Sequence, residues 1–318
     1  ENMTIYGNGG AGLWARTYDS VYMVNCDVYA NCDSLDAGSP GGDGDGFVAS
    51  ARGGSNGDNS DTTRVTYIEG CGAYWNSDDG FDIGTIKQLV FINNWSFANG
   101  RMNGDGTGLK LSYSWMLDQN SRVVSNNITA YNQKEGDLSG AGMSETNLYD
   151  EVRGPRANYF NNFSYKDYCS YTHALGYWHC DSIFFAKDVY RNNISYAPTN
   201  PSGTQAFFGC CDYGDPSPYV VASDNTFLIG ELAAAVNNPA FTVTDDDFVS
   251  LDSAELRLPR KSSGALPDIT FSRLVGGSDM KSEGMDVGMS STPDIGIDWA
   301  YLDSNLGIDS RSEEHTSE

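Results

Sequence analysis

A short phrase of alternating apolar and polar residues recurs along the first two thirds of the chain. Aliphatic and aromatic side chains alternate with polar ones, which is the pattern of a strand with one buried face. Each copy carries an asparagine or a cysteine at its third position. The copies occupy residues 24–31, 69–76, 92–99, 125–132, 160–167 and 191–198, with a weaker copy around Asn225.

The spacing of these copies predicts the architecture. Their third positions are residues 26, 71, 94, 127, 162, 193 and 225, so most intervals are 23 to 35 residues, the length of one solenoid coil with loops. Stacked coils lie about 4.8 Å apart, so like residues form ladders along the axis. A ladder asparagine bonds to its neighbours through its amide and tolerates a left-handed backbone at a bend. We therefore predict an all-β fold, a parallel β-helix (β-solenoid) with long loops.

Four of the recurring asparagines have a second interpretation. Each begins an Asn-x-Ser/Thr sequence, the acceptor for glycosylation; they are Asn94, Asn127, Asn162 and Asn193. Because one ladder explains all four, we favour stacking, and glycosylation is the less favoured alternative.

The repeat fades near residue 245, where the pattern changes and prolines follow. We predict a β-helix catalytic domain over residues 1–245, with a truncated N-terminus. Residues 246–310 are predicted to be a C-terminal capping segment of the same domain that covers the open end of the solenoid. Residues 311–318 resemble a translated sequencing adapter, and we expect them to be a non-native tail. Insertions rich in glycine and aspartate are predicted surface loops; they are residues 37–46, 50–61 and 136–147.

Composition narrows the partners. With 36 Gly and 19 Tyr in 318 residues, the chain has the composition of turn-rich β structure. Nineteen basic against 43 acidic residues give a net charge of −24, which argues against nucleic acid and suits a soluble secreted protein. No apolar run approaches the roughly 18 residues of a membrane span. We expect a secreted, extracellular monomer whose export signal is absent from this chain, and an acidic ligand only if a cation is bound nearby.

Acidic residues concentrate in one stretch, residues 76–82, which reads Asn-Ser-Asp-Asp-Gly-Phe-Asp. Its Asp-Gly-Phe phrase occurs once more, beginning at Asp45, and residues 107–110 repeat its shape with a lysine at the end. If the three segments stack as neighbouring coils, Asp45 lies in line with Asp79, and Lys110 in line with Asp82. Each pair would be about 5 Å apart at the backbone.

Carboxylates so close together repel one another. Each pair at about 5 Å costs on the order of 3 kcal/mol at an effective dielectric constant near 20. On a rigid coil edge such a cluster favours a cation, and its oxygen ligands and irregular geometry favour Ca²⁺. The alternative is a solvated Asp-Gly turn, but the register with Asp45 and Lys110 favours the metal site.

These segments resemble a known family. Residues 45–47, 76–82 and 108–111 are similar to the motifs of the family 9 polysaccharide lyases, the pectate lyase group with a right-handed parallel β-helix. The resemblance covers most of the chain, including the Ser-Leu-Asp and Leu-Pro-Arg phrases of the capping segment. The sequence departs from the family after residue 111, where Ser112 and Tyr113 stand in place of an expected glycine, and the loop after Asp45 is long.

The resemblance implies a reaction and a set of roles. It implies that Lys110 is the catalytic base and that four residues bind Ca²⁺: Asp45, Asp78, Asp79 and Asp82. The substrate would be pectate (polygalacturonate) or another acidic polysaccharide, cleaved by β-elimination. Ca²⁺ at the substrate carboxylate would stabilise the carbanion, and a neutral Lys110 would take the C5 proton.

The pKa of a lysine side chain is about 10.4 in model peptides. Because the base must be neutral, we expect activity to be favoured at alkaline pH. The alternative role for Lys110 is a salt bridge to Asp82.

Two further sets of residues bear on metal or substrate binding. A zinc site is disfavoured because the spacing of its candidate ligands matches no common pattern; the candidates are Cys169, His173, His179 and Cys180. Three basic residues are candidates for gripping substrate carboxylates but receive no assigned role; they are Lys134, Arg153 and Arg156.

Three functions therefore stay open. The first is a calcium-dependent polysaccharide lyase. The second is a β-helix glycoside hydrolase that uses Asp78 and Asp79 for acid–base work without metal. The third is a non-catalytic solenoid that binds glycans.

Overall fold

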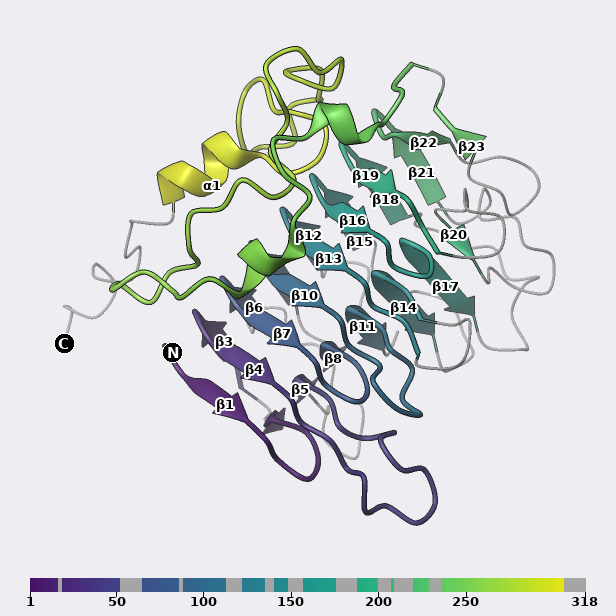
Figure 1. Cartoon of the computed structure of the whole chain (residues 1–318), viewed down its shortest axis with the longest axis vertical. Helices are drawn as coiled ribbons and strands as arrows, with labels where there is room; N and C mark the ends of the chain where they lie inside the picture. Colours follow the sequence, from purple (N-terminus) through teal and green to yellow (C-terminus); the bar gives the residue numbers. More distant parts are fainter. Residues whose placement is uncertain are drawn as a thin grey trace.

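The computed structural model (Figure 1) shows a parallel β-helix, as the repeat predicted. Each coil gives one strand to each of three parallel sheets, so that strands of successive coils lie side by side. The structure describes residues 1–16, 19–51, 65–85, 88–112, 122–134, 140–147, 157–175, 188–199, 207–208, 220–228, 236–238 and 240–305. Within these ranges no helix is long and apolar enough to cross a membrane.

The strands of each sheet follow one another coil by coil. The first sheet holds β1 (Thr4–Tyr6), β4 (Asp27–Tyr29), β7 (Gly72–Tyr74), β10 (Trp95–Phe97), β13 (Ile128–Ala130), β16 (Phe163–Tyr165) and β19 (Ile194–Tyr196). The second holds β2 (Leu13–Arg16), β5 (Phe47–Ala51), β8 (Phe81–Thr85), β11 (Leu109–Ser112), β14 (Met143–Asn147), β17 (Tyr171–Leu175) and β20 (Phe207–Phe208). The third holds β3 (Val21–Val24), β6 (Val65–Glu69), β9 (Gln88–Ile92), β12 (Arg122–Ser125), β15 (Ala157–Phe160), β18 (Asp188–Arg191) and β21 (Val220–Ser223).

A few elements lie outside the three sheets. They are the antiparallel pair β22 (Phe227–Leu228) and β23 (Val236–Asn237), the 3₁₀ helices η1 (Asp245–Asp247) and η2 (Ser253–Arg257), and the helix α1 (Trp299–Asn305).

The core lies inside the coils and is built from like residues stacked on like. Phe47 of β5 stacks on Phe81 of β8 with ring centroids 4.7 Å apart, and Tyr159 stacks on Tyr190 at 4.5 Å. All four rings are buried. Offset aromatic stacking adds about 0.5–1.5 kcal/mol per pair beyond the area buried, so the apolar positions of the repeat stabilise the stack of coils.

An asparagine ladder runs along the axis, as predicted. Asn162 donates from its backbone nitrogen and from Nδ2 to Oδ1 of Asn193, each at 3.0 Å, and the same pair of bonds links each of these neighbours: Asn94, Asn127, Asn162, Asn193 and Asn225. Each of these side chains is at most 1% exposed. A glycan cannot be attached to a side chain buried in this way, so the glycosylation interpretation is wrong for the folded chain.

The left-handed residue at each bend differs from the prediction. It is the residue before the ladder asparagine, as at Asn93 (φ 58°) and Asn161 (φ 54°). The left-handed residue turns the chain, and the next side chain then points inward, where it can bond along the axis. The coils have a second ladder of the same kind, formed by Asn8, Asn31, Asn76, Asn99, Asn132 and Asp167.

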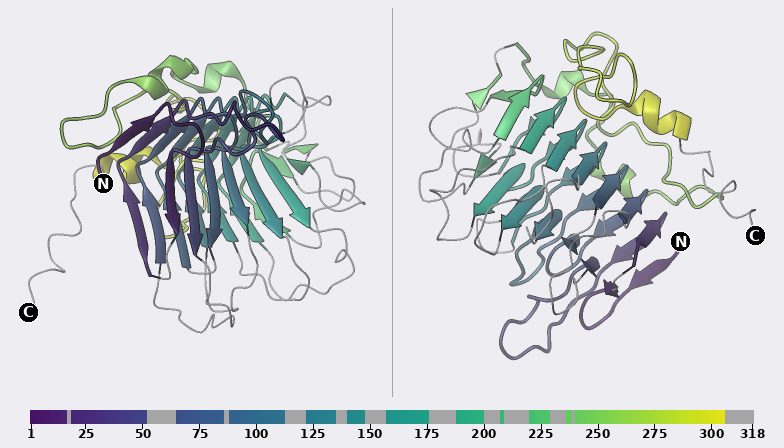
Figure 2. Two further views of the ribbon diagram at one scale, coloured as in Figure 1. Left: turned by 90° about the horizontal axis from the view of Figure 1, so that it is seen from below. Right: turned by 180° about the vertical axis from the view of Figure 1, so that it is seen from behind.

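The C-terminal segment, residues 240–305, lies along the outer face of the first sheet (Figures 1 and 2). Trp95, Ile128 and Phe163 of that sheet pack in one buried cluster with residues such as Phe271 and Trp299. We had expected the segment to cover the open end of the solenoid. It lies along the flank because the outward positions of the first sheet are apolar and need a cover, whereas the middle residue of β10, β13 and β16 is Ser or Thr. The domain boundaries at residues 245 and 310 stay a prediction.

Candidate metal and catalytic site

Three consecutive coils bring the predicted site residues together on the second sheet. Asp45 lies just before β5, Asp79 just before β8, and Lys110 within β11. Asp82 pairs in register with Lys110. Gly46 donates its backbone nitrogen to the Asp79 carbonyl at 2.9 Å, which places Asp45 beside Asp79. Both predicted alignments are therefore confirmed.

Glycine is required next to these aspartates because the coils approach closely there. A Cβ at Gly46 would lie 2.4 Å from the Gly80 carbonyl oxygen, and one at Gly80 would lie 2.1 Å from Oγ of Ser96. A side chain at either position would push the coils apart and disturb the alignment.

Asp45, Asp78 and Asp79 form a compact carboxylate cluster. Each contributes an oxygen, and these oxygens lie within 4.8 Å of one another. The three side chains are 8%, 6% and 0% exposed. Backbone amides hold all three, since Asp79 N donates to Asp45 Oδ1 at 3.2 Å, Asp105 N to Asp78 Oδ1 at 2.5 Å and Thr107 N to Asp79 Oδ1 at 2.9 Å.

Asp79 Oδ2 is buried and accepts no hydrogen bond from the part of the chain that the structure describes. Nζ of Lys110 lies 3.0 Å from it as an ion pair, outside hydrogen-bonding directions. A buried carboxylate oxygen without a donor is costly, so this atom is suited to a further electrostatic partner.

The cluster carries more negative charge than its surroundings compensate. Burial and the charges of Asp79 and Asp82 raise the pKa of Asp45 to about 8. Burial and the charges of Asp79 and Asp45 raise the pKa of Asp78 to about 10. Burial also raises the pKa of Asp79, to about 6, although Lys110 acts in the opposite direction. Within the described residues, the single ammonium group of Lys110 thus compensates the three carboxylates only in part.

Lys110 lies at the edge of this cluster and is 22% exposed. Its Nζ pairs with Asp79 Oδ2 at 3.0 Å and with Asp105 Oδ2 at 2.8 Å. Burial lowers the pKa of Lys110, but the carboxylates of Asp79, Asp82 and Asp105 outweigh burial and raise it well above its usual value. Asp105 was missed from the sequence; the Asp-Gly pair directly before the Thr-Gly-Leu-Lys segment is the signal that could have found it.

Asp82 stands apart from the other three predicted ligands. It is half-buried on β8 and is not among the three residues whose oxygens lie within 4.8 Å of one another. Its charge nevertheless raises the pKa values of Asp45 and Asp79. Its role as a ligand stays a prediction.

The donor set fits a hard cation. It consists of carboxylate oxygens in an irregular arrangement, as Ca²⁺ prefers. The raised pKa values and the unbonded Oδ2 of Asp79 both indicate that a positive charge would be stabilised here. The residues present therefore fit the predicted Ca²⁺.

Most of the zinc candidates and of the basic residues named from the sequence lie outside the part of the chain that the structure describes. Cys169 is fully buried, and burial raises the pKa of its thiol, which disfavours the thiolate that zinc needs. The side chain of His173 and the whole of His179, Cys180, Arg153 and Arg156 lie outside the described residues. Lys134 is described and half-buried, but nothing in the structure gives it a role.

Comparison with known proteins places these observations in context. A sequence profile described as "Pel9A-like, right handed beta helix region" matches residues 1–167. Pectate lyase L of Dickeya chrysanthemi is 27% identical over 312 residues, which cover 93% of this chain and 60% of that protein. Pectate lyase L of Dickeya dadantii (strain 3937) is 27% identical over 313 residues, with the same coverage. The chain thus spans 60% of the length of these relatives.

Two solved structures share the fold. The crystal structure of pectate lyase Pel9A aligns with a TM-score of 0.63 at 23% identity, covering 93% of this chain and 64% of that one. A structure titled rhamnogalacturonan lyase aligns with a TM-score of 0.55 at 24% identity, covering 87% and 62%.

Proposed function

The chain belongs to the Pel9A-like right-handed β-helix family, and from this premise we propose that it is a calcium-dependent polysaccharide lyase. Its substrate would be polygalacturonate or a related uronate polymer. One observation carries the proposal: on neighbouring coils, a buried cluster of Asp45, Asp78 and Asp79 lies against Lys110, whose Nζ is 3.0 Å from Asp79. The names of the two pectate lyase relatives support the same reaction.

In this proposal the four aspartates bind the metal ion and the lysine is the catalytic base. Asp45, Asp78 and Asp79, with Asp82 beside them on β8, would hold Ca²⁺, which when bound would supply Lewis acidity at the substrate carboxylate. The backbone amides of Asp105 and Thr107 orient two of these carboxylates. The protein thus presents oxygens whose positions are fixed before substrate arrives.

Lys110 would take the proton from C5 of the uronate. The C–H electron pair becomes the C4–C5 double bond, the C4–O bond breaks, and the leaving oxygen takes up a proton. A base must be neutral to act, but the uncompensated carboxylates keep Lys110 protonated. Once the charge of Asp79 is compensated, the main cause of the raised pKa is gone. The same carboxylates that bind the cation therefore control the base.

A hydrolase fits this geometry less well. The carboxyl groups of a retaining glycosidase lie about 5–5.5 Å apart and those of an inverting one farther apart, with access to the glycosidic bond. Asp78 and Asp79 are 6% and 0% exposed and belong to a group whose oxygens lie within 4.8 Å. They are suited to sharing a cation and poorly placed to reach a glycosidic oxygen.

An extracellular location and a monomeric state stay predictions.

The product of the reaction tests the proposal. Polygalacturonate would be incubated with the protein in Ca²⁺, and the ends formed would be analysed by mass spectrometry and by a reducing-end assay. We expect an unsaturated uronate, lighter by one water than a hydrolysis product. Saturated ends would show a hydrolase, and an unchanged polymer that is nevertheless bound would show a glycan-binding solenoid.

A further inference from the structure

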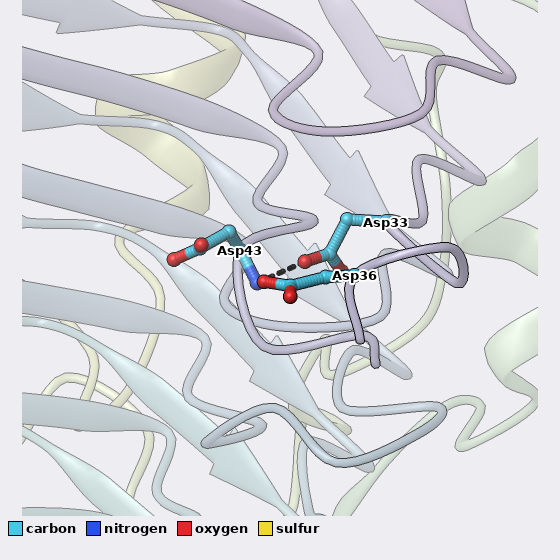
Figure 3. Close-up of side chains that lie close together, drawn as sticks. All are labelled: Asp33, Asp36 and Asp43. Carbon is cyan, nitrogen blue, oxygen red and sulfur yellow. Dashed lines mark hydrogen bonds between the residues drawn. The ribbon is translucent and has the colours of Figure 1, made fainter. Parts of the chain in front are cut away.

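A second carboxylate group lies in the loop between β4 and β5, apart from the site described above. Asp33, Asp36 and Asp43 each contribute an oxygen, and these oxygens lie within 4.8 Å of one another. Figure 3 shows the three side chains on this one loop. The group shares no residue with the first cluster.

Asp33 is the buried member and is only 8% exposed. Its Oδ2 accepts a hydrogen bond of 3.1 Å from the backbone nitrogen of Asp43, drawn as a dashed line in Figure 3. Its Oδ1 is also buried but accepts no hydrogen bond from the described residues. A buried carboxylate oxygen that has lost water and gained no donor is expensive to maintain. The described residues therefore leave this atom without the partner that its burial requires.

No basic side chain of the described residues supplies that partner. Within the described ranges, no lysine or arginine forms an ion pair with Asp33, Asp36 or Asp43. The first cluster differs in this respect, because Lys110 pairs with Asp79. The loop thus concentrates three negative charges, one of them buried, in a protein whose net charge is already −24.

The backbone of the loop holds the three aspartates in place. Asp36 N donates to the Asp33 carbonyl at 2.9 Å, and Gly38 N donates to Asp36 Oδ1 at 2.8 Å. Gly41 has a left-handed backbone (φ 89°), and a Cβ there would lie 2.5 Å from Cβ of Met102. These turns fold the loop back on itself, so that one oxygen of each carboxylate lies within 4.8 Å of the others.

We propose that Asp33, Asp36 and Asp43 bind a second, structural Ca²⁺ ion. The donors are carboxylate oxygens, the geometry is irregular, and Asp36 and Asp43 are exposed enough for water to complete the six to eight ligands, roughly, that Ca²⁺ takes. A site this open has the affinity of extracellular modules, with a dissociation constant of about 10⁻⁴–10⁻³ M.

The ion would stabilise a loop that leads directly to the first cluster. Ser77 Oγ donates to the Gly41 carbonyl at 2.9 Å, and Asp78 N donates to the Gly44 carbonyl at 3.3 Å. The loop then ends at Asp45. The second ion would thus hold the segment that positions Asp45 and Asp78. The proposal does not require the chain to be a lyase.

Equilibrium dialysis against Ca²⁺ tests the proposal. Binding would be measured for the wild type and for Asp36→Asn. The buffer would contain about 0.15 M monovalent salt, because at this ionic strength the Debye length is about 8 Å and non-specific attraction of Ca²⁺ to the negative surface is screened. Asp286→Asn is the matched control. Asp286 is exposed, and its Oδ1 accepts a 2.8 Å bond from Gly288 N, as Asp36 Oδ1 does from Gly38 N. Each variant removes one negative charge, but Asp286 belongs to neither carboxylate group of the described residues.

We expect the wild type and Asp286→Asn to bind one more ion per chain than Asp36→Asn at saturating Ca²⁺. Asp33→Asn should lose the same ion, and its amide oxygen can still accept from Asp43 N. Equal binding by Asp36→Asn and Asp286→Asn would overturn the proposal. The variant Asp79→Asn distinguishes the two sites. If Asp79→Asn lost an ion and Asp36→Asn bound as many ions as the wild type, the second site alone would be rejected. The reverse result would support the second site and reject the first.

Discussion

Nζ of Lys110 lies 3.0 Å from Oδ2 of Asp79, an atom that accepts no hydrogen bond from any described residue. The two residues belong to neighbouring coils, and the pair links the proposed base to a proposed metal ligand. Because Asp79 is the largest cause of the raised pKa of Lys110 among the charges around it, compensation of the carboxylate and activation of the lysine are coupled.

The first prediction concerns Lys110. Lys110→Met should lower the rate of polygalacturonate cleavage by about 10²–10⁴-fold, the usual contribution of a general base, and should leave Ca²⁺ binding in place. Initial rates and calorimetric titration with Ca²⁺ would measure the two effects. Lys261→Met is the control, because Lys261 also pairs with an aspartate, Asp268, at 2.6 Å, but on the flank. Equal rates for both variants would remove Lys110 from the mechanism.

The second prediction concerns Asp79. Asp79→Asn should weaken Ca²⁺ binding at the first cluster by tenfold or more, which is about 1.4 kcal/mol or more, because it removes one charge from the donor set. Calorimetric titration would measure the change. Asp294→Asn is a matched control: Asp294 is 9% exposed and pairs with Lys281 at 2.7 Å. If both variants kept wild-type affinity, Asp79 would not be a ligand.

Much of this site could be predicted because it depends on register. Once Asp45, Asp79 and the Thr-Gly-Leu-Lys segment are placed in line, the coil spacing fixes their proximity. Asp105 could not be assigned in this way, because it lies in a turn outside the repeated phrase and meets Lys110 only through loop geometry. Sequence alone also left Asp82 equal to the other aspartates, whereas its position on β8 sets it apart from the compact group.

The fold, too, could be predicted in part. The asparagine ladder could be predicted because the same phrase recurs in successive segments of the sequence. The place of residues 240–305 depends instead on Trp95, Ile128 and Phe163 being apolar on the outer face of the first sheet. That requires knowing which face of each short strand points outward, and a three-residue strand shows too little alternation for this.

The third prediction concerns pH and the second ladder. Asp167 occupies a ladder position and accepts bonds from Thr129 Oγ1 and Ser164 Oγ, both at 2.7 Å. Burial raises its pKa from 3.8 to about 6. The folded state therefore favours the protonated acid, so this residue's contribution to stability is fully present below about pH 4 and is lost as pH rises through about 6. The loss amounts to about 3 kcal/mol at 1.36 kcal/mol per pKa unit.

Asp167→Asn should remove this dependence. The free energy of unfolding, measured with urea between pH 4 and pH 8, roughly the window given by the two pKa values, should fall less with rising pH in the variant than in the wild type. Taking the difference between the two proteins cancels the titration of other groups. Parallel curves would show that the raised pKa of Asp167 does not affect stability.

The fourth prediction concerns the flank segment. Arg260 bonds to both carboxylate oxygens of Asp27, at 2.7 and 2.5 Å, and to the carbonyls of Cys26 and Gly70. Arg260→Met should lower the free energy of unfolding by about 2–3 kcal/mol, because it leaves a partly buried carboxylate without its partner. Lys261→Met, next in sequence and more exposed, should cost at most about 1 kcal/mol. A single urea transition in both would show that the segment unfolds with the coils, and equal costs would contradict the assigned role of Arg260.

The most direct test of the central claim is the ultraviolet absorbance of polygalacturonate solutions during incubation with the protein. The unsaturated product absorbs, whereas the polymer and its hydrolysis products do not. The account predicts no rise in chelator, a steady rise when Ca²⁺ is restored, and a rise at least about 10²-fold slower with Lys110→Met at any Ca²⁺ concentration. An equal rise in chelator and in Ca²⁺, or no rise with the wild type in excess Ca²⁺, would contradict it.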